Sequence, residues 1–187
     1  MPGTMITDRL FFALQPDAVT AAAIAALAAR LHAQLGLKGK PLAPARLHVT
    51  LHFIGAFAGL PQEIVNRACD AAAALTAPPF DVCFDRVMSF SRTDSRKPVV
   101  LVGGDSLAPL CDFQKRLKAA MLSADVPDAS GMSFTPHITL LNGDRPLAEQ
   151  RVEPFCWKVR EFALVRSLVG RGQHEILARF PLNTCPL

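Results

Sequence analysis

The stretch RLHVTLHFIG, residues 46–55, alternates between apolar and polar side chains. Successive side chains of a β-strand point to opposite faces, so this stretch predicts a strand with two different faces. The apolar face, which is predicted to join the core, holds Leu47, Val49, Leu51 and Phe53. The other face holds His48, Thr50 and His52. That polar face must point away from the core.

A second stretch, FTPHITLL at residues 134–141, repeats the pattern. His137 and Thr139 share one predicted face, and Ile138 and Leu140 share the other. Both stretches follow a predicted helix and a loop, so the chain reads as two copies of one unit. If an approximate twofold axis relates the copies, the two His-Thr faces meet across one cleft.

The remaining pattern predicts strands and helices on both sides of these motifs. The predicted strands cover residues 9–14, 80–90, 99–104, 156–169 and 174–182. The predicted helices cover residues 19–35, with Asp17 as N-cap and Gly36 after its end, 59–75 and 107–122. Residues 91–98 are predicted to be a loop, and 144–150 a helical turn. This order predicts an α+β fold with two pseudo-symmetric lobes of mainly antiparallel sheet, helices packed outside and a central cleft.

The bulk composition fits one globular, bilobal domain over residues 1–187. The chain is 50% hydrophobic and 19% charged, with a net charge of +4 and a pI near 9.0. This moderate basicity permits an anionic ligand, and the guanidinium of arginine suits phosphate. The N-terminal residues lack a signal-peptide pattern, and the most apolar window, AVTAAAIAALAA, is too short to span a bilayer. We therefore expect no membrane association.

Five cysteines occur, at positions 69, 83, 111, 156 and 185, without CxxC or clustered spacing. Such spacing disfavours a disulfide framework or a structural zinc site. We expect reduced thiols in a cytoplasmic monomer.

Two histidines that face one cleft suit acid–base chemistry at phosphorus. An imidazole titrates near neutral pH, so one ring can act as a base while the other acts as an acid. Thr50 and Thr139 can hydrogen-bond phosphate oxygens, and arginines can neutralise the charge of the phosphate. No metal or cofactor is needed, which favours a strained substrate such as a 2′,3′-cyclic phosphate. Zinc bound by His48, His52 and His137 is the alternative, but no Asp, Glu or Cys lies at ligand spacing beside them.

With these motifs the sequence resembles the 2H phosphoesterase superfamily, which is named for its two HxT motifs. It is most similar to the RNA 2′,3′-cyclic phosphodiesterases, also called 2′-5′ RNA ligases. LHVTLHFIG resembles the first motif of that family and FTPHITLL the second. RLFFAL resembles its opening strand, and FALVRSLVGRGQHEILARFPL resembles its closing hairpin.

The resemblance implies a role for each matching residue. His48 would donate a proton to the leaving 3′ oxygen, and His137 would accept a proton from the attacking water. Thr50 and Thr139 would hold the phosphate. The implied partner is RNA with 2′,3′-cyclic phosphate ends, the implied product is a 2′-phosphomonoester, and the implied reverse reaction is 2′-5′ joining of RNA ends.

The chain departs from the family pattern at two positions. Asn142 stands where a basic residue is common just after the second motif, so another cation must meet the phosphate; the candidates are Arg145, Arg171 and Arg46. His174 stands where the closing hairpin often has a tyrosine, and we expect it to be exposed. Further candidate substrate contacts are His52 and Phe12.

Two alternatives stay open on the sequence alone. One is an RNA-end-binding module that has the fold without catalysis. The other is a 2H phosphodiesterase that acts on 2′-5′ oligonucleotides or small cyclic nucleotides. The motifs describe the phosphate and not the base, so they do not separate these substrates.

Overall fold

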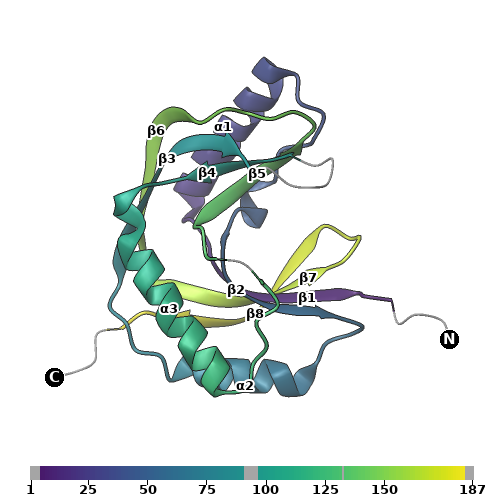
Figure 1. Cartoon of the computed structure of the whole chain (residues 1–187), viewed down its shortest axis with the longest axis vertical. Helices are drawn as coiled ribbons and strands as arrows, with labels where there is room; N and C mark the ends of the chain where they lie inside the picture. Colours follow the sequence, from purple (N-terminus) through teal and green to yellow (C-terminus); the bar gives the residue numbers. More distant parts are fainter. Residues whose placement is uncertain (1–4, 91–96, 132, 184–187) are drawn as a thin grey trace.

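A computed structural model describes residues 5–90, 97–131 and 133–183 of the chain (Figure 1). It contains an eight-stranded sheet in the order β6-β3-β4-β5-β2-β1-β7-β8, in which every neighbouring pair is antiparallel. The strands are β1 (Asp8–Leu14), β2 (Val49–Phe57), β3 (Phe80–Ser89), β4 (Lys97–Val102), β5 (His137–Gly143), β6 (Gln150–Val159), β7 (Glu161–Leu168) and β8 (Gln173–Pro181). The helices are α1 (Ala18–Leu35), α2 (Gln62–Ala73) and α3 (Ala108–Ser123), with short 3₁₀ turns η1 (Pro44–Arg46) and η2 (Asp105–Leu107). The α+β prediction is confirmed.

The strand order reflects the two copies expected from the sequence. The unit β1–α1–β2 in the first half corresponds to β4–α3–β5 in the second. In the sheet, β2 and β5 are central neighbours, with β1 beside β2 and β4 beside β5. The two motif strands therefore meet at the middle of the sheet.

Each long helix contacts a strand in the half of the sheet that belongs to the other copy. Helix α1 contacts β5 and β6, whereas α3 contacts β2 as well as β3. Figure 1 shows α1 beside the β3–β6 half, and α2 and α3 along the half formed by β2, β1, β7 and β8. The two copies are thus interlocked by exchanged helices.

Helix α1 begins and ends where its capping residues predict. The carboxylate of Asp17 accepts a hydrogen bond from the Thr20 backbone N–H at 2.9 Å, and Gly36 adopts a left-handed φ of 58°. By length and composition alone this 18-residue helix could cross a membrane. Its stripe of buried residues instead joins the core; the stripe comprises Ala21, Ile24, Leu27, Ala28 and Leu31. Burial of this stripe accounts for part of its apolar character, because 28% of the helix is buried and Val19 is exposed.

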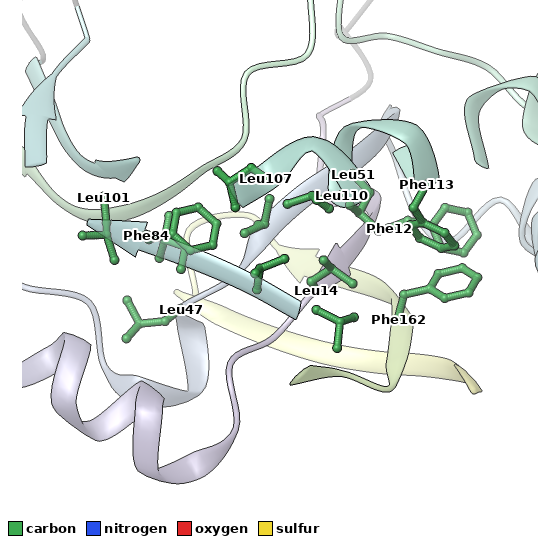
Figure 2. Close-up of a cluster of buried hydrophobic side chains, with 14 of the residues drawn as sticks. Phe12, Leu14, Leu47, Leu51, Phe84, Leu101, Leu107, Leu110, Phe113 and Phe162 are labelled. Carbon is green, nitrogen blue, oxygen red and sulfur yellow. The ribbon is translucent and has the colours of Figure 1, made fainter. Parts of the chain in front are cut away.

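Large side chains from distant segments fill the core, as Figure 2 shows. The Phe162 ring lies 5.8 Å from the ring of Phe12 and 5.1 Å from that of Phe113. These rings join β7 to β1 and to α3. Burying aromatic and leucine side chains stabilises a fold by roughly 1.5–3 kcal/mol each.

Three local predictions are wrong. The apolar run 156–169 is not one strand, because it breaks at Arg160 between β6 and β7. Strand β6 begins at Gln150 and includes Pro154, which an edge strand tolerates. The helical turn expected over 144–150 is absent, since Leu147 exchanges hydrogen bonds with Ser89. The loop predicted over 91–98 is too long, because β4 already begins at Lys97. The rest of the predicted loop, 91–96, lies outside the described residues.

The prediction of reduced cysteines is wrong for one pair. Cys83 and Cys156 form a disulfide. The register of β3 with β6 places these two residues directly opposite each other. Cys69 and Cys111 are free, and Cys185 lies outside the described residues. The disulfide removes one premise of the cytoplasmic expectation.

Candidate active site

The two motifs meet through one backbone pair at the centre of the sheet. Val49 of β2 pairs with Ile138 of β5 in antiparallel register, and both side chains are buried. One step along such a ladder sets His48 across from Thr139 and Thr50 across from His137. These four side chains lie on the face opposite to Val49 and Ile138, here called the motif face. All four are partly buried.

A β-bulge follows the threonine of each motif. In the first copy Thr50 pairs with Ala13 and His52 with Phe12, so Leu51 has no partner in β1. In the second copy Thr139 pairs with Val100 and Leu141 with Val99, so Leu140 has no partner in β4. An extra residue reverses the alternation of faces beyond it. Beyond the bulge the residues that follow each threonine change faces, so His52 and Leu141 leave the motif face, whereas Phe53 pairs with Phe11 on it.

The bulge corrects the prediction that His52 shares a face with His48. His52 pairs with Phe12, a core residue, and is only 3% exposed. Its Nε2–H donates to the carbonyl of Pro127 at 2.9 Å. Burial lowers the pKa of His52, although this hydrogen bond opposes the shift. The His52 ring therefore lies on the core side of β2.

Phe12, another candidate for a substrate contact, is also a core residue. It is 0% exposed and lies among the other aromatic rings of the core. Its neighbour Phe11 is the residue on the motif face, where it stacks on His48 with ring centroids 5.0 Å apart. Adjacent strand residues point to opposite faces, so the sequence already indicated that only one of Phe11 and Phe12 can face the site.

The orientation of His48 is fixed by the residue two positions earlier. Its Nδ1–H donates to the carbonyl of Arg46 at 2.7 Å, which leaves Nε2 as the nitrogen available for proton transfer. Burial is the main cause that lowers the pKa of His48, and the hydrogen bond to Arg46 raises it. Positive charge on His137 and on Arg46 lowers the pKa further, which indicates that these groups surround one site.

His137 has the same local geometry. Its Nδ1–H donates to the carbonyl of Thr135, also two residues earlier, at 2.8 Å. Its ring meets that of Phe90 edge to face, with centroids 4.9 Å apart. Each motif histidine thus has a carbonyl on Nδ1 and a phenylalanine beside its ring.

His174 lies in this site, contrary to the expected exposed position. Its ring is partly buried and lies 5.2 Å from that of His48 and 5.6 Å from that of Phe11, both nearly edge to face. The register of β7 with β8 sets it across from Ser167 on the motif face. Burial lowers the pKa of His174 to about 4, and the positive charges of His48 and Arg46 act in the same direction.

The three candidate arginines lie in different places. Arg145 is exposed and donates to the carbonyl of Gly36, and Arg171 is exposed in the β7–β8 turn. Arg46 is partly buried, and its charge lowers the pKa of both His48 and His174. Its Nε is buried with no hydrogen-bond partner within the described part of the chain. Of the three candidate arginines, Arg46 is therefore the one that lies beside His48 and His174.

A cavity of about 230 Å³ adjoins the motif face. Its walls include Thr50, Phe53, Gln114, Lys118, Phe134 and His137, and His52 also borders it. A larger hollow of about 530 Å³ lies between the start of α1 and the β6–β7 junction. That hollow contains none of the motif histidines or threonines, whereas Thr50 and His137 line the smaller cavity. We therefore assign the candidate active site to this cavity together with the part of the motif face that carries His48 and Thr139. Across residues 5–90, 97–131 and 133–183, no three His, Cys, Asp or Glu side chains are grouped to hold a metal ion.

The sequence profile of the 2′-5′ RNA ligase superfamily matches residues 13–171. This chain belongs to that superfamily, the 2H phosphoesterases. The match spans both HxT motifs and the strands that carry them. The chain is therefore a member of a superfamily of phosphoesterases that act on RNA or nucleotides.

Solved structures of 2H phosphoesterases have the same fold. E. coli LigT in its apo form superposes with a TM-score of 0.76 at 25% sequence identity, and the match covers 96% of this chain and 100% of LigT. LigT complexed with 3′-AMP superposes with a TM-score of 0.76 at 26% identity, covering 95% and 99%. Usb1 of Kluyveromyces marxianus, at 13% identity and a TM-score of 0.57 over 97% and 100%, shows the fold alone. A search of curated proteins found no match.

Proposed function

We propose that this 2H phosphoesterase hydrolyses RNA 2′,3′-cyclic phosphate ends to 2′-phosphomonoesters with a His/His acid–base pair. The observation that carries the proposal is the equivalent setting of His48 and His137 on one face of the sheet. A carbonyl accepts the Nδ1–H of each ring, so each presents Nε2 to the substrate. Acid–base catalysis of in-line displacement requires two such groups on opposite sides of the phosphorus atom.

In the proposed reaction His137 acts as the base. Its Nε2 takes a proton from water while the water oxygen attacks phosphorus. The bond between phosphorus and the 3′ oxygen breaks, and protonated His48 gives its Nε2 proton to that oxygen. The products are a 3′-hydroxyl and a 2′-phosphomonoester, and the proton lost by His48 is balanced by the one gained by His137.

Thr50 and Thr139 would hold the non-bridging oxygens through their hydroxyl groups. The guanidinium of Arg46 would neutralise the charge that grows on these oxygens in the transition state. It takes the place of the basic residue that Asn142 replaces. The reverse reaction, 2′-5′ joining of RNA ends, follows when each histidine acts in the opposite sense.

The pH dependence of hydrolysis should be bell-shaped, because one histidine must be neutral and the other protonated. Burial lowers the pKa of His48, so the alkaline limb of kcat/KM should begin below the range of an exposed histidine. A flat profile from about pH 5 to 9 would contradict a pair of catalytic histidines.

The direct test uses a short RNA with a 2′,3′-cyclic phosphate end in the presence of EDTA. We expect the wild type to yield the 2′-phosphate and His48→Ala or His137→Ala to lose about 10²–10⁴-fold in kcat. His32→Ala, in helix α1 away from the site, is the matched control and should keep wild-type activity. Full activity of either motif variant would contradict the mechanism, and loss of wild-type activity in EDTA would favour a metal.

The same assay separates the alternatives that the sequence left open. Tight binding of the RNA end without cleavage would support an RNA-end-binding module. Cleavage of 2′-5′ oligonucleotides or small cyclic nucleotides in preference to the cyclic RNA end would assign the site to another substrate. Chromatography on a sizing column in the same buffer tests the expected monomer.

A further inference from the structure

The rings of Phe11, His48 and His174 form a cluster at the first motif. Phe11 of β1 stacks on the face of His48 with an interplanar angle of 27°. His174 of β8 meets His48 at 74° and Phe11 at 76°. The three centroids lie 5.0, 5.2 and 5.6 Å apart, so each ring contacts the other two.

Together with the backbone, this cluster fixes the His48 ring. The carbonyl of Arg46 holds Nδ1, and Phe11 covers one face of the ring. Without His174, rotation of the His48 side chain would be opposed by Phe11 and by one hydrogen bond alone. Misplacement of a catalytic group by about 1 Å can cost about 10²-fold in rate. His174 is therefore placed to maintain the direction of the reactive Nε2.

The charge state of His174 also matters to His48. A cation at position 174 would repel the proton on His48, and Arg46 already adds positive charge to the site. Among the groups facing His174, His48 and Arg46 disfavour its protonation. Glu175, the next residue in β8, could favour it, but Glu175 pairs with Arg166 instead. Burial first, and then the positive charges of His48 and Arg46, hold the pKa of His174 at about 4, so its ring is neutral near pH 7.

We propose that His174 is a positioning residue that holds the His48 ring and, because it carries no charge, allows His48 to keep the proton that it donates. This inference rests on the proposed function, in which His48 is the acid. The proposal deepens that function, because it assigns a role to a third ring in the site.

Three substitutions separate the two parts of the role. His174→Phe keeps a ring at this position and stays uncharged, so kcat should fall less than about threefold. His174→Ala removes the ring, so kcat should fall about 10–100-fold with KM nearly unchanged, because misorientation affects the chemical step. His174→Lys adds a charge, so the alkaline limb of the rate profile should move to lower pH.

The control is His32→Ala in helix α1, which lies away from the three rings and should leave kcat unchanged. Thermal unfolding of every variant identifies a protein that has lost its fold. A kcat of His174→Ala equal to that of the wild type would overturn the proposal. A rise in KM alone would also overturn it, since His174 would then bind substrate rather than position His48.

A titration of the His48 ring by NMR tests the coupling without any substrate. In His174→Lys the pKa of His48 should be lower than in the wild type, and in His174→Phe it should change little. An unchanged pKa in His174→Lys would overturn the electrostatic part of the proposal. If the wild type does not cleave the cyclic RNA end, the proposed function fails, whereas the titration still decides whether His174 acts on His48.

Discussion

His52 occupies in the first copy the position that Leu141 occupies in the second. Both residues follow a bulged leucine, and both are buried, with 3% and 0% of their surface exposed. Corresponding positions of two similar units have the same environment, and here that environment is the core. The motif therefore contributes one histidine per copy to the site, although the first copy contains two.

Replacing His52 with leucine should have little effect on catalysis. We expect kcat/KM of His52→Leu to stay within about threefold of the wild type, since the ring lies on the core side of β2. The lost hydrogen bond to Pro127 costs about 1 kcal/mol, and the added apolar burial offsets it. Urea unfolding should show a net change below about 1 kcal/mol.

The matched variant is Leu141→His, which puts an imidazole in the corresponding core position. The imidazole would lack a partner like the Pro127 carbonyl that His52 has, so the free energy of unfolding should fall by about 2–4 kcal/mol. A hundredfold loss of activity in His52→Leu, with the fold intact, would show that His52 contributes directly to catalysis.

Arg46 should matter more than the other two candidate arginines. Arg46→Ala removes the cation beside His48 and should lower kcat/KM about 10–100-fold, equivalent to roughly 1.4–2.7 kcal/mol of transition-state stabilisation. Arg145→Ala and Arg171→Ala should change kcat/KM less than about threefold, because both side chains are exposed. Arg46→Lys keeps a charge but lacks the planar donor fork, so it should recover only part of the loss. Equal losses in all three alanine variants would contradict this ranking.

The fold should lose stability as the pH falls from neutral. The pKa values of His48, His52 and His174 are lowered, mainly by burial, so these residues bind fewer protons in the folded than in the unfolded state. The free energy of unfolding is therefore highest above about pH 6.5 and declines as the pH falls toward the folded-state pKa values. For His174, with a pKa of about 4, the loss between pH 7 and pH 5 should be about 1 kcal/mol after solvent screening of a partly buried ring.

Urea unfolding at pH 7 and pH 5 measures this effect. His174→Phe removes the titrating group while it keeps the ring, so its loss of stability over the same range should be smaller than that of the wild type. A larger or equal loss in His174→Phe would assign the pH dependence to other groups.

The disulfide between Cys83 and Cys156 can be checked chemically. Peptide mapping by mass spectrometry without reductant should find the peptides that contain these two residues linked, and reductant should separate them. Cys83→Ser with Cys156→Ser should lower the free energy of unfolding by roughly 2–4 kcal/mol, since the disulfide closes a loop of 73 residues. Finding both thiols free in the oxidised protein would contradict the pairing.

The sequence was sufficient for the paired motifs because alternation and repetition are local patterns. The alternation within each motif predicts that His48 and Thr50 share a face, and that His137 and Thr139 do. The bulges at Leu51 and Leu140 could not be predicted, since an extra residue in one strand depends on its partner strand. The face on which His52 lies depends on the bulge at Leu51, so it could not be predicted either.

Other errors had the same origin in long-range pairing. The position of His174 depends on how β8 aligns with β7 and how β7 aligns with β1, and nothing local determines either register. The Cys83–Cys156 bond depends on β6, whose polar and proline-containing first half gave no strand signal. Asp17 and Gly36, by contrast, act within one helical turn, and both were predicted correctly.

The exchange of helices between the two copies resembles a domain-swapped dimer whose subunits are one polypeptide. A half expressed alone, with β1, α1 and β2 but without β5 and β6, would leave the apolar stripe of α1 uncovered. Two such halves could satisfy each other only by associating through the same contacts. Cleavage between α2 and β3 should therefore leave two fragments that stay together until a denaturant separates them. Such a molecule is suited to reconstitution from two separately produced pieces, each of which contributes one motif histidine, His48 or His137.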